Sequence, residues 1–166
     1  MKNLVSGADD TNNSLPNYEA NVVKLAPLGS DSPDSLVEAK GVCSVVIVSY
    51  KTGEVLMDCI RSVLRQSKLH QLILVDNGNT RQTVQQLNEI ADKNSKFEII
   101  TGHGNVGFSK GCNLGVRRAR GEYILLLNPD SILQIDTLIP ALEVFESHPN
   151  TSLLTVRIEN VDGTEQ

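Results

Sequence analysis

Long apolar runs are missing from this 166-residue sequence. No segment approaches the roughly 20 consecutive apolar residues that a membrane-spanning helix requires. The first residues, MKNLVSGADDTNNS, also lack the apolar stretch at the centre of a secretory signal peptide. We therefore expect neither a membrane-spanning helix nor a cleavable secretion signal in this sequence.

An excess of positive charge is absent as well. The 15 lysines and arginines are outnumbered by 20 aspartates and glutamates, which gives a formal net charge of -5. A general electrostatic attraction to nucleic acid is therefore not expected. The length is sufficient for one domain with its own core, and the hydrophobic fraction of 40% is ordinary for a globular protein.

Cysteine is scarce, with only Cys43, Cys59 and Cys112 in the chain. Their number is odd, and their spacing matches no zinc-binding motif. Cys43 lies in an apolar run and Cys59 on an apolar helical face, so we interpret the cysteines as small buried hydrophobic residues. Free buried thiols are typical of the reducing cytoplasm. The expected location is the cytoplasm, with the inner face of the membrane as the alternative.

Residues 1–41 differ in composition from the rest of the chain. They are rich in Asn, Asp, Ser and Pro, and their apolar residues show no sustained period. We interpret this segment as a polar leader that is disordered or loosely packed. One or two short helices that pack on the domain are the alternative. Residues 42–166 are then the domain itself.

From residue 42 onward, continuous apolar runs alternate with segments of helical periodicity. The run VCSVVIV at 42–48 is apolar throughout, which is typical of a strand covered on both faces of a parallel sheet. We expect strands at 42–48, 71–75, 97–100, 123–127 and 152–158, and helices at 55–64, 84–91, 108–119 and 136–145. This order predicts an α/β fold, a mostly parallel sheet with helices on both faces.

Charged and small residues mark the expected helix ends. Arg117, Arg118 and Arg120 fall in the last turn of the third helix, where they complement its dipole, and Gly121 is a candidate C-cap. A basic patch near anionic lipid head groups, and so peripheral membrane association, is the alternative for these arginines. Asp136 is expected to cap the fourth helix.

Polar residues follow four of the expected strands. In open parallel sheets, ligands bind outside the carboxyl ends of the strands. The segments at those ends are 49–50, 76–77, 102–107 and 128–130. Such residues also form turns, so each segment alone is a weak indication, and the four together favour a binding site.

The segment 102–107 reads G-H-G-N-V-G, a literal G-x-G-x-x-G. In a dinucleotide-binding fold this loop should follow the first strand, with an acid at the end of the next strand. Here it follows the third expected strand, and the next strand ends in the neutral Asn128. An NAD(P)-binding Rossmann oxidoreductase domain is therefore kept only as an alternative.

Four stretches occur in a specific order: IVSYK at 47–51, LVDNG at 74–78, NVGFSKGCNLG at 105–115 and GEYILLLNPD at 121–130. Together they resemble the nucleotide-binding half of a family 2 inverting glycosyltransferase of the GT-A fold, most closely its rhamnosyltransferase-like branch. The resemblance covers residues 42–166. It implies transfer of a sugar from a UDP- or dTDP-sugar to a glycan or lipid-linked acceptor hydroxyl, in bacterial cell-surface polysaccharide synthesis.

The resemblance also implies a role for each strand-end residue. Ser49 and Tyr50 would meet the nucleotide base, and Asp76 would accept a hydrogen bond from the base or its ribose. Asn128 stands where the family has the first acid of a D-x-D motif, and would hydrogen-bond the ribose. Asp130 would bind Mg²⁺ or Mn²⁺, which bridges the diphosphate and stabilises its negative charge.

Further residues are expected to support this site. Gly104, Asn105 and Gly107 would form a tight passage from strand to helix, with glycine backbone at positive φ. Asn113 matches a family position on the following helix, for packing and for holding the loop of Asp130.

One part of the family's machinery is not recognised in the sequence. Asp162-Gly163 is a good hairpin turn, and no returning strand follows it. In the family, the general base and the acceptor surface lie beyond this point. We therefore expect an incomplete domain that binds nucleotide and transfers sugar poorly, and no general base is assigned. A non-catalytic nucleotide-binding module on the same scaffold is the second alternative.

Overall fold

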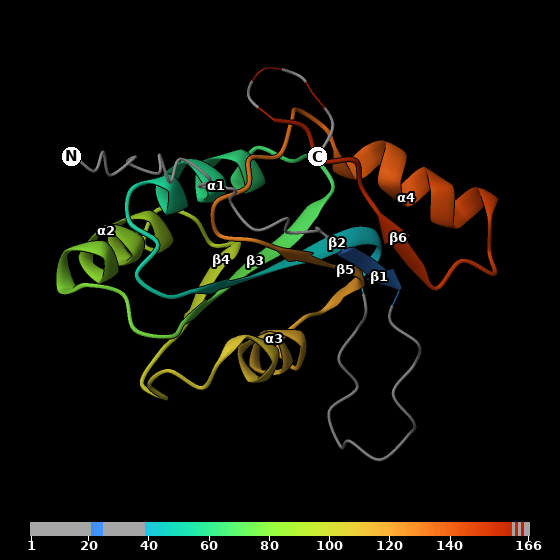
Figure 1. Ribbon diagram of the computed structural model, residues 1–166. Coiled ribbons are helices and arrows are strands. Elements are labelled where there is room, and N and C mark those ends of the chain that lie inside the picture. Colours follow the sequence, from blue (N-terminus) through green and yellow to red (C-terminus); the bar gives the residue numbers. More distant parts are fainter. Residues whose placement is uncertain (1–20, 25–38, 161, 163, 165–166) are drawn as a thin grey trace, which may run out of the picture.

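In the computed structural model, residues 21–24, 39–160, 162 and 164 are described. They form a six-stranded sheet with the strand order β4-β3-β2-β5-β1-β6 (Figure 1). The elements along the chain are β1 (Asn21–Lys24), β2 (Ala39–Ser49), α1 (Val55–Leu64), β3 (Leu69–Asp76), α2 (Arg81–Ala91), β4 (Phe97–Ile100), α3 (Phe108–Val116), β5 (Gly121–Leu127), α4 (Leu138–Ser147) and β6 (Leu153–Thr155).

The centre of the sheet is parallel, as the sequence predicts. β2 pairs with β3 and with β5, and β3 pairs with β4, all in parallel register. Residues 43–49 of β2 are buried without interruption. β2 lies between two strands and is covered on both faces, which explains why its sequence is continuously apolar and not alternating.

The other edge of the sheet contains a strand that the sequence did not indicate. β1 pairs antiparallel with β5, and β6 pairs antiparallel with β1. β6 therefore runs in the direction of the parallel strands, with β1 inserted between it and β5. Of the predicted polar leader, residues 39–41 belong to β2. Residues 1–20 and 25–38 of that leader lie outside the described residues.

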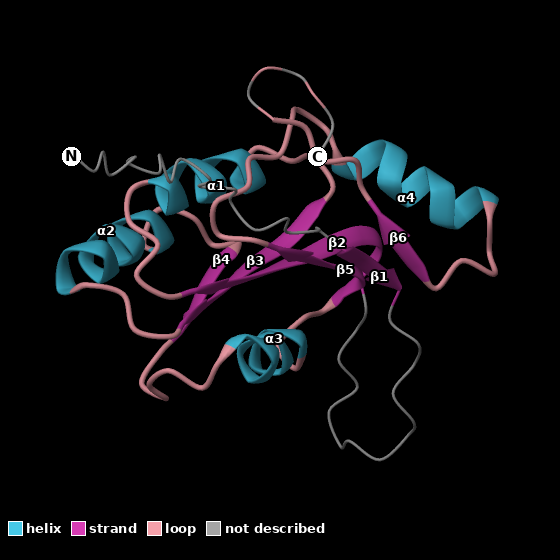
Figure 2. Cartoon of the chain, viewed as in Figure 1, coloured by secondary structure: helices cyan, strands magenta, loops and turns pink. Residues whose placement is uncertain are grey.

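Helices cover both faces of the sheet, which confirms the predicted layers (Figure 2). α1, α2 and α4 contribute apolar side chains to the larger core, which includes Ile60, Leu87 and Phe145. α3 covers the opposite face, where Cys112 packs with Val48 of β2. Among the described residues, no helix combines the length and the apolar composition that crossing a bilayer requires.

α3 approaches β2 closely because it presents glycines to the strand. A Cβ added at Gly111 would lie 2.8 Å from Cγ1 of Val48, and one added at Gly115 would lie 2.3 Å from Cγ1 of Val46. Both distances are shorter than any ordinary carbon contact. The two glycines are four residues apart and so share one face of the helix. This contact fixes where α3 begins relative to the ends of β2 and β3.

Two of the predicted helix ends are wrong. α3 ends at Val116, so the three arginines follow the helix instead of forming its last turn. Gly121 is no C-cap but the first residue of β5, where an added Cβ would lie 2.7 Å from the backbone nitrogen of Ser44. Asp136 does not cap α4, because Thr137 stands at the N-cap position and no side chain caps the helix. Oδ1 of Asp136 instead accepts a hydrogen bond from the Ser67 hydroxyl at 2.9 Å.

The three cysteines are free and buried, as the sequence predicts. Burial raises the pKa of the Cys43 and Cys59 thiols from 9.0 to about 12. Both thiols are therefore neutral in the folded state at any ordinary pH. Because the thiolate is the reactive form, we expect a thiol reagent at neutral pH to modify them only when the chain unfolds.

These thiols should also make stability depend on alkaline pH. Their folded pKa lies above the unfolded value, so the stabilisation is complete below about pH 9 and is lost as pH rises towards 12. The free energy of unfolding should fall by about 1 kcal/mol per thiol per pH unit in that range. Urea unfolding at several pH values measures it. A Cys43→Ala/Cys59→Ala double variant should show a shallower decline, and an equal decline would contradict the assignment.

Candidate functional site

Three neighbouring parallel strands bring the sequence-predicted polar residues to one edge of the sheet. Ser49 at the end of β2 is in register with Asp76 at the end of β3. On the other side of β2, Ile47 pairs with Leu127, the last residue of β5. Asn128 and Asp130 follow directly. We call Ser49, Tyr50, Asp76, Asn128 and Asp130 the polar rim, and the topology places all five at the same end of the sheet.

Asp76 forms a turn with one carboxylate oxygen and leaves the other available. Its Oδ1 accepts hydrogen bonds from the backbone N–H groups of Gly78 and Asn79, at 3.0 and 2.8 Å, and from Asn79 Nδ2 at 2.8 Å. Among the residues that the structure describes, no donor contacts Oδ2. Asp76 as a residue is 7% exposed, and the three hydrogen bonds to Oδ1 hold its carboxylate in one orientation. The turn and the binding role, which the sequence could not separate, are therefore compatible.

Asn79 links the ends of β2 and β3, and sequence reasoning missed it. Its Oδ1 accepts a hydrogen bond from the Ser49 hydroxyl at 3.1 Å, while its Nδ2 donates to Asp76. The Ser49 hydroxyl also lies 2.9 Å from that of Thr52. Ser49 is completely buried, so it organises the rim from beneath. The only indication of this role in the sequence is the segment Asp-Asn-Gly-Asn at 76–79, in which Asn79 is typical of an ordinary turn.

Tyr50 presents an aromatic surface at the rim. Tyr50 is 49% exposed, although its large ring is mostly apolar. The ring lies on Gly78, where an added Cβ would be 3.5 Å from the ring. Nζ of Lys51 lies 5.2 Å from the ring centroid, and Lys51 itself has φ 51. An exposed ring backed by glycine offers a flat surface on which a planar group can stack.

The glycine-rich segment forms a tight passage, as predicted. Gly102, Gly104 and Gly107 have φ values of 89, 66 and 81, a region that side chains disfavour. No atom lies within 4 Å of a Cβ added at any of them, so backbone conformation alone requires glycine there. The Asn105 side chain stabilises the turn by accepting a hydrogen bond from Gly107 N–H at 2.9 Å.

Asn77 connects this passage to the end of β3. Its Nδ2 donates to the carbonyl of Gly107 at 3.1 Å, and its Oδ1 lies 3.2 Å from Nε2 of His103. Because that amide oxygen can only accept, Nε2 of His103 carries the proton. The buried Nδ1 of His103 has no hydrogen-bond partner. The side chain of Asn77 thus places the start of α3 beside the polar rim.

The loop that carries Asp130 is held by Ser62 of α1 and by Gln66, which follows that helix. Leu133 N–H donates to the Ser62 hydroxyl at 3.0 Å. Nε2 of Gln66 donates to the carbonyl of Gln134 at 2.8 Å, and its Oε1 accepts from Leu138 N–H at 3.3 Å. Ser62 and Gln66 are both buried. These contacts fix a segment that contains no regular structure between β5 and α4.

Asn113 does not take the predicted supporting role. Its side chain is exposed on α3, on the opposite face of the sheet from the helix that holds the loop of Asp130. The contacts that pack α3 come instead from Gly111 and Gly115. The side chains of Ser62 in α1 and of Gln66 after it perform the supporting function that the sequence assigned to Asn113.

The donor groups at the rim fit a hard divalent cation only with help from a ligand. Within the described part of the chain, no three His, Cys, Asp or Glu side chains gather into a metal site. Asp130 is exposed, with no cation within ion-pair distance among the described residues, and Asn128 is nearly buried beside it. Mg²⁺ is commonly held by one or two carboxylates together with phosphate oxygens. One carboxylate here is sufficient if phosphates complete the coordination.

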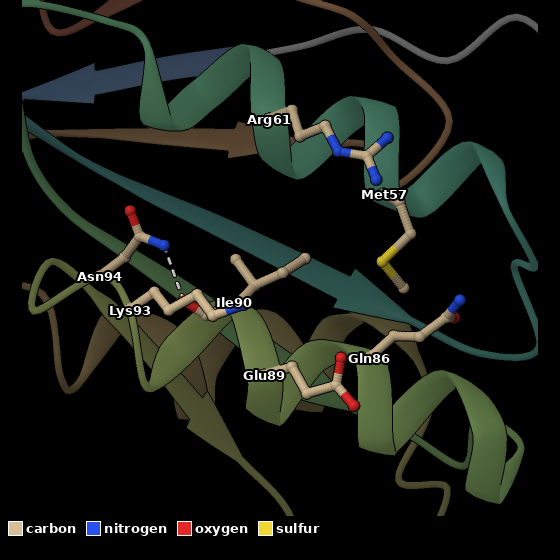
Figure 3. Close-up of a pocket in the computed structure, with 7 residues that line it drawn as sticks. All are labelled: Met57, Arg61, Gln86, Glu89, Ile90, Lys93 and Asn94. Carbon is tan, nitrogen blue, oxygen red and sulfur yellow. Dashed lines mark hydrogen bonds between the residues drawn. The ribbon is translucent and has the colours of Figure 1, made fainter.

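Two pockets of the described residues lie away from the rim. One, of about 270 Å³, lies between α1 and α2 (Figure 3). It is lined by Met57, Arg61, Gln86, Glu89, Ile90, Lys93 and Asn94. The other lies at the amino-terminal ends of β3 and β4. The polar rim lies at an open edge of the sheet. The case for a binding site there depends on its residues and their contacts.

A family model and a curated relative both identify this sequence as similar to glycosyltransferases. Residues 44–166 match the family model of glycosyl transferase family 2. Glycosyltransferase GlyG of Streptococcus pneumoniae is 29% identical over 99 residues, which cover 57% of this chain and 33% of that protein. The chain therefore spans about a third of the length of this curated relative.

Solved structures share the fold. The structure of residues 1–349 of Staphylococcus aureus TarS, in complex with UDP-GlcNAc, has a TM-score of 0.58 at 22% identity, and the likeness covers 65% of this chain and 32% of that one. A mannosyltransferase from Pyrobaculum calidifontis, in complex with GDP-Man and Mn²⁺, has a TM-score of 0.55 at 14% identity, covering 61% and 32%. These likenesses confirm the predicted α/β architecture.

Proposed function

The chain belongs to glycosyl transferase family 2, and on that premise we propose that its polar rim binds the nucleoside diphosphate of a sugar donor. In this proposal, the Tyr50 ring stacks on the base, and Oδ2 of Asp76 accepts a hydrogen bond from the base or the ribose. The Asn128 side chain contacts the ribose. The start of α3, beside Gly107, directs backbone N–H groups towards the phosphates.

The observation that carries the proposal is the arrangement of Asp76. A carboxylate that is nearly buried, fixed by three donors at one oxygen and open at the other, is a preorganised acceptor. It lies next to an exposed aromatic ring that rests on Gly78. An acceptor beside a stacking surface is the combination that a nucleoside requires. The complexes of the two structural neighbours with UDP-GlcNAc and with GDP-Man support this ligand class.

Asp130 is proposed to hold Mg²⁺ or Mn²⁺ against the diphosphate. The Mn²⁺ in the mannosyltransferase complex supports a divalent cation. When bound, such an ion stabilises the negative charge that develops on the leaving diphosphate. The chain's own contribution is to fix the position of Asp130, which it does through the contacts of Ser62 and Gln66 to the loop.

The finer assignments belong to the same proposal. They are an inverting mechanism, the rhamnosyltransferase-like branch, a UDP- or dTDP-sugar donor, a glycan or lipid-linked acceptor, and a cytoplasmic location with peripheral membrane association. The general base and the acceptor surface are proposed to lie outside this chain. Bacterial cell-surface polysaccharide synthesis is supported by TarS, named as a poly(ribitol-phosphate) β-N-acetylglucosaminyltransferase. The NAD(P)-binding and non-catalytic alternatives gain no support from these comparisons.

Calorimetric titration of the chain with UDP, dTDP and NAD, each with and without Mn²⁺, tests the proposal. We expect a nucleoside diphosphate to bind and Mn²⁺ to increase its affinity at least tenfold, while NAD does not bind. Asp130→Asn removes the charge that a hard cation prefers. This variant should lose the Mn²⁺-dependent increase and keep the metal-free affinity.

Asp92→Asn is the matched control, because Asp92 is an exposed aspartate at the end of α2, away from the rim. It should behave as the parent does with every ligand. Binding of NAD in preference to the nucleoside diphosphates would refute the proposed function. An unchanged Mn²⁺ effect in Asp130→Asn would refute the cation assignment alone.

A further inference from the structure

A polar pocket lies at the opposite end of the sheet from the polar rim. It has a volume of about 240 Å³ and is lined by His70, Gln71, Ser95, Lys96, Glu98 and Arg120. Along β4, Glu98 alternates with Phe97 and Ile99, which pack into the core on the α1 side. Glu98 therefore projects to the α3 face, and the pocket lies on that face, at the starts of β3 and β4.

Positive charge is concentrated around this pocket, although the whole chain is acidic. Lys96 and Arg120 line it, and the only carboxylate of the lining, Glu98, is already paired with Arg118 at 3.7 Å. Among the described residues, neither Lys96 nor Arg120 has a carboxylate within 4.0 Å. Two cations therefore face one small volume without a neutralising partner.

Hydrogen bonds fix the ammonium group of Lys96 and the backbone that carries Arg120. Nζ of Lys96 donates to the carbonyl of Leu69 at 2.8 Å, which leaves two of its N–H groups for a ligand. Gln71 holds the segment that precedes β5, because its Nε2 donates to the carbonyl of Arg118 at 3.1 Å and its Oε1 accepts from Arg120 N–H at 2.9 Å. The backbone that carries Arg120 is thus attached to the first residues of β3.

We propose that this pocket binds a phosphate group through Lys96 and Arg120, with His70 and Ser95 as additional hydrogen-bonding groups. A phosphate oxygen accepts from an ammonium or a guanidinium in a charge-assisted bond, and a guanidinium can donate two such bonds in parallel. The ligand is a phosphate compound in solution or the head group of an anionic lipid. The site is separate from the polar rim and does not depend on the function proposed for it.

Titration of the ¹⁵N-labelled chain with inorganic phosphate tests the site residue by residue. The amide resonances of residues 70–71, 95–98 and 120–121 should shift in a saturable manner. Arg120→Gln and Lys96→Gln should each weaken binding at least about fivefold. Lys93→Gln is the control, because Lys93 is an exposed lysine that lines the pocket between α1 and α2. It should leave the dissociation constant unchanged.

The side chain of Arg120 is exposed and makes no ion pair among the described residues, so Arg120→Gln alone decides the matter if Lys96→Gln lowers stability. Absence of any saturable shift, shifts confined to residues 76–79 and 107–110, or an unchanged affinity in Arg120→Gln would each overturn the proposal. Sedimentation with phosphatidylcholine vesicles, with and without phosphatidic acid, identifies the source. Arg120-dependent binding to the anionic vesicles indicates a lipid head group, and phosphate binding without vesicle binding indicates a soluble compound.

Discussion

Gly115→Leu should lower the free energy of unfolding by about 3 kcal/mol. The first added carbon alone would lie 2.3 Å from Cγ1 of Val46, which is buried in the central strand and has little freedom to rotate. α3 would have to move away from β2 to accommodate the side chain. Because α3 begins beside the polar rim, the same change should also weaken nucleotide binding. Urea-induced unfolding followed by circular dichroism measures the stability loss.

Asn113→Leu is the matched control for this prediction. It introduces the same residue two positions away on the same helix, where the side chain is exposed. Leucine has a higher helix propensity than either glycine or asparagine, so helix propensity alone should stabilise α3 in both variants. A change within about 0.5 kcal/mol is expected for the control. Equal stability of the two variants would show that α3 does not depend on its close approach to β2.

Asp76→Asn should reduce affinity for a nucleoside diphosphate by about 10- to 100-fold, with little loss of stability. The amide oxygen of asparagine can replace Oδ1 in the turn, accepting from Gly78 and Asn79. An NH₂ group then stands where Oδ2 was, and it cannot accept a hydrogen bond from the ligand. Loss of a hydrogen bond to a charged group costs about 1.5–3 kcal/mol, which corresponds to that range of affinity.

Asp76→Ala separates the two roles of this residue. Alanine removes the turn as well as the ligand contact, so this variant should lose both stability and affinity. Asp58→Asn, at an exposed aspartate on α1 that pairs with Arg61, controls for the loss of one charge and should bind as the parent does. If Asp76→Asn binds UDP and dTDP with the parent's affinity, Oδ2 is not the acceptor, and the assignment of the rim to a nucleotide is wrong.

Periodicity predicted the regular elements well where the pattern was local. The apolar face of α1 gave that helix its observed bounds, and the apolar run at 97–100 gave those of β4. β1 was missed because four residues, NVVK, carry too little pattern to be separated from their polar surroundings. Its partners lie on β5 and β6, far away in the sequence. Pairing at that distance leaves no local signal.

The sequence indicated which residues form the candidate site. It did not indicate the hydrogen bonds that hold them in place. Strand ends directed attention to Asp76 and Asn128, because parallel strands end at a common edge. The contacts of Asn79, Ser62 and Gln66 were not predicted, since each is a polar residue whose partner is set by tertiary packing. Asp136 was misassigned for the same reason, because a hydroxyl on a distant loop competes for its carboxylate. Hydrogen-bond partners between distant segments are not encoded in any spacing.

The position of β1 has a consequence for how the sheet assembles. Within the described part of the chain, β6 is attached to the sheet only through β1. β1 can join the sheet only when residues 21–24 meet residues 123–126, far along the sequence, and β6 can pair only after β1 is in place. Closing so large a loop carries an entropic cost, and contacts of high contact order form slowly. We therefore expect the parallel strands to pair before β1 and β6 do, and β6 to leave the sheet whenever β1 does.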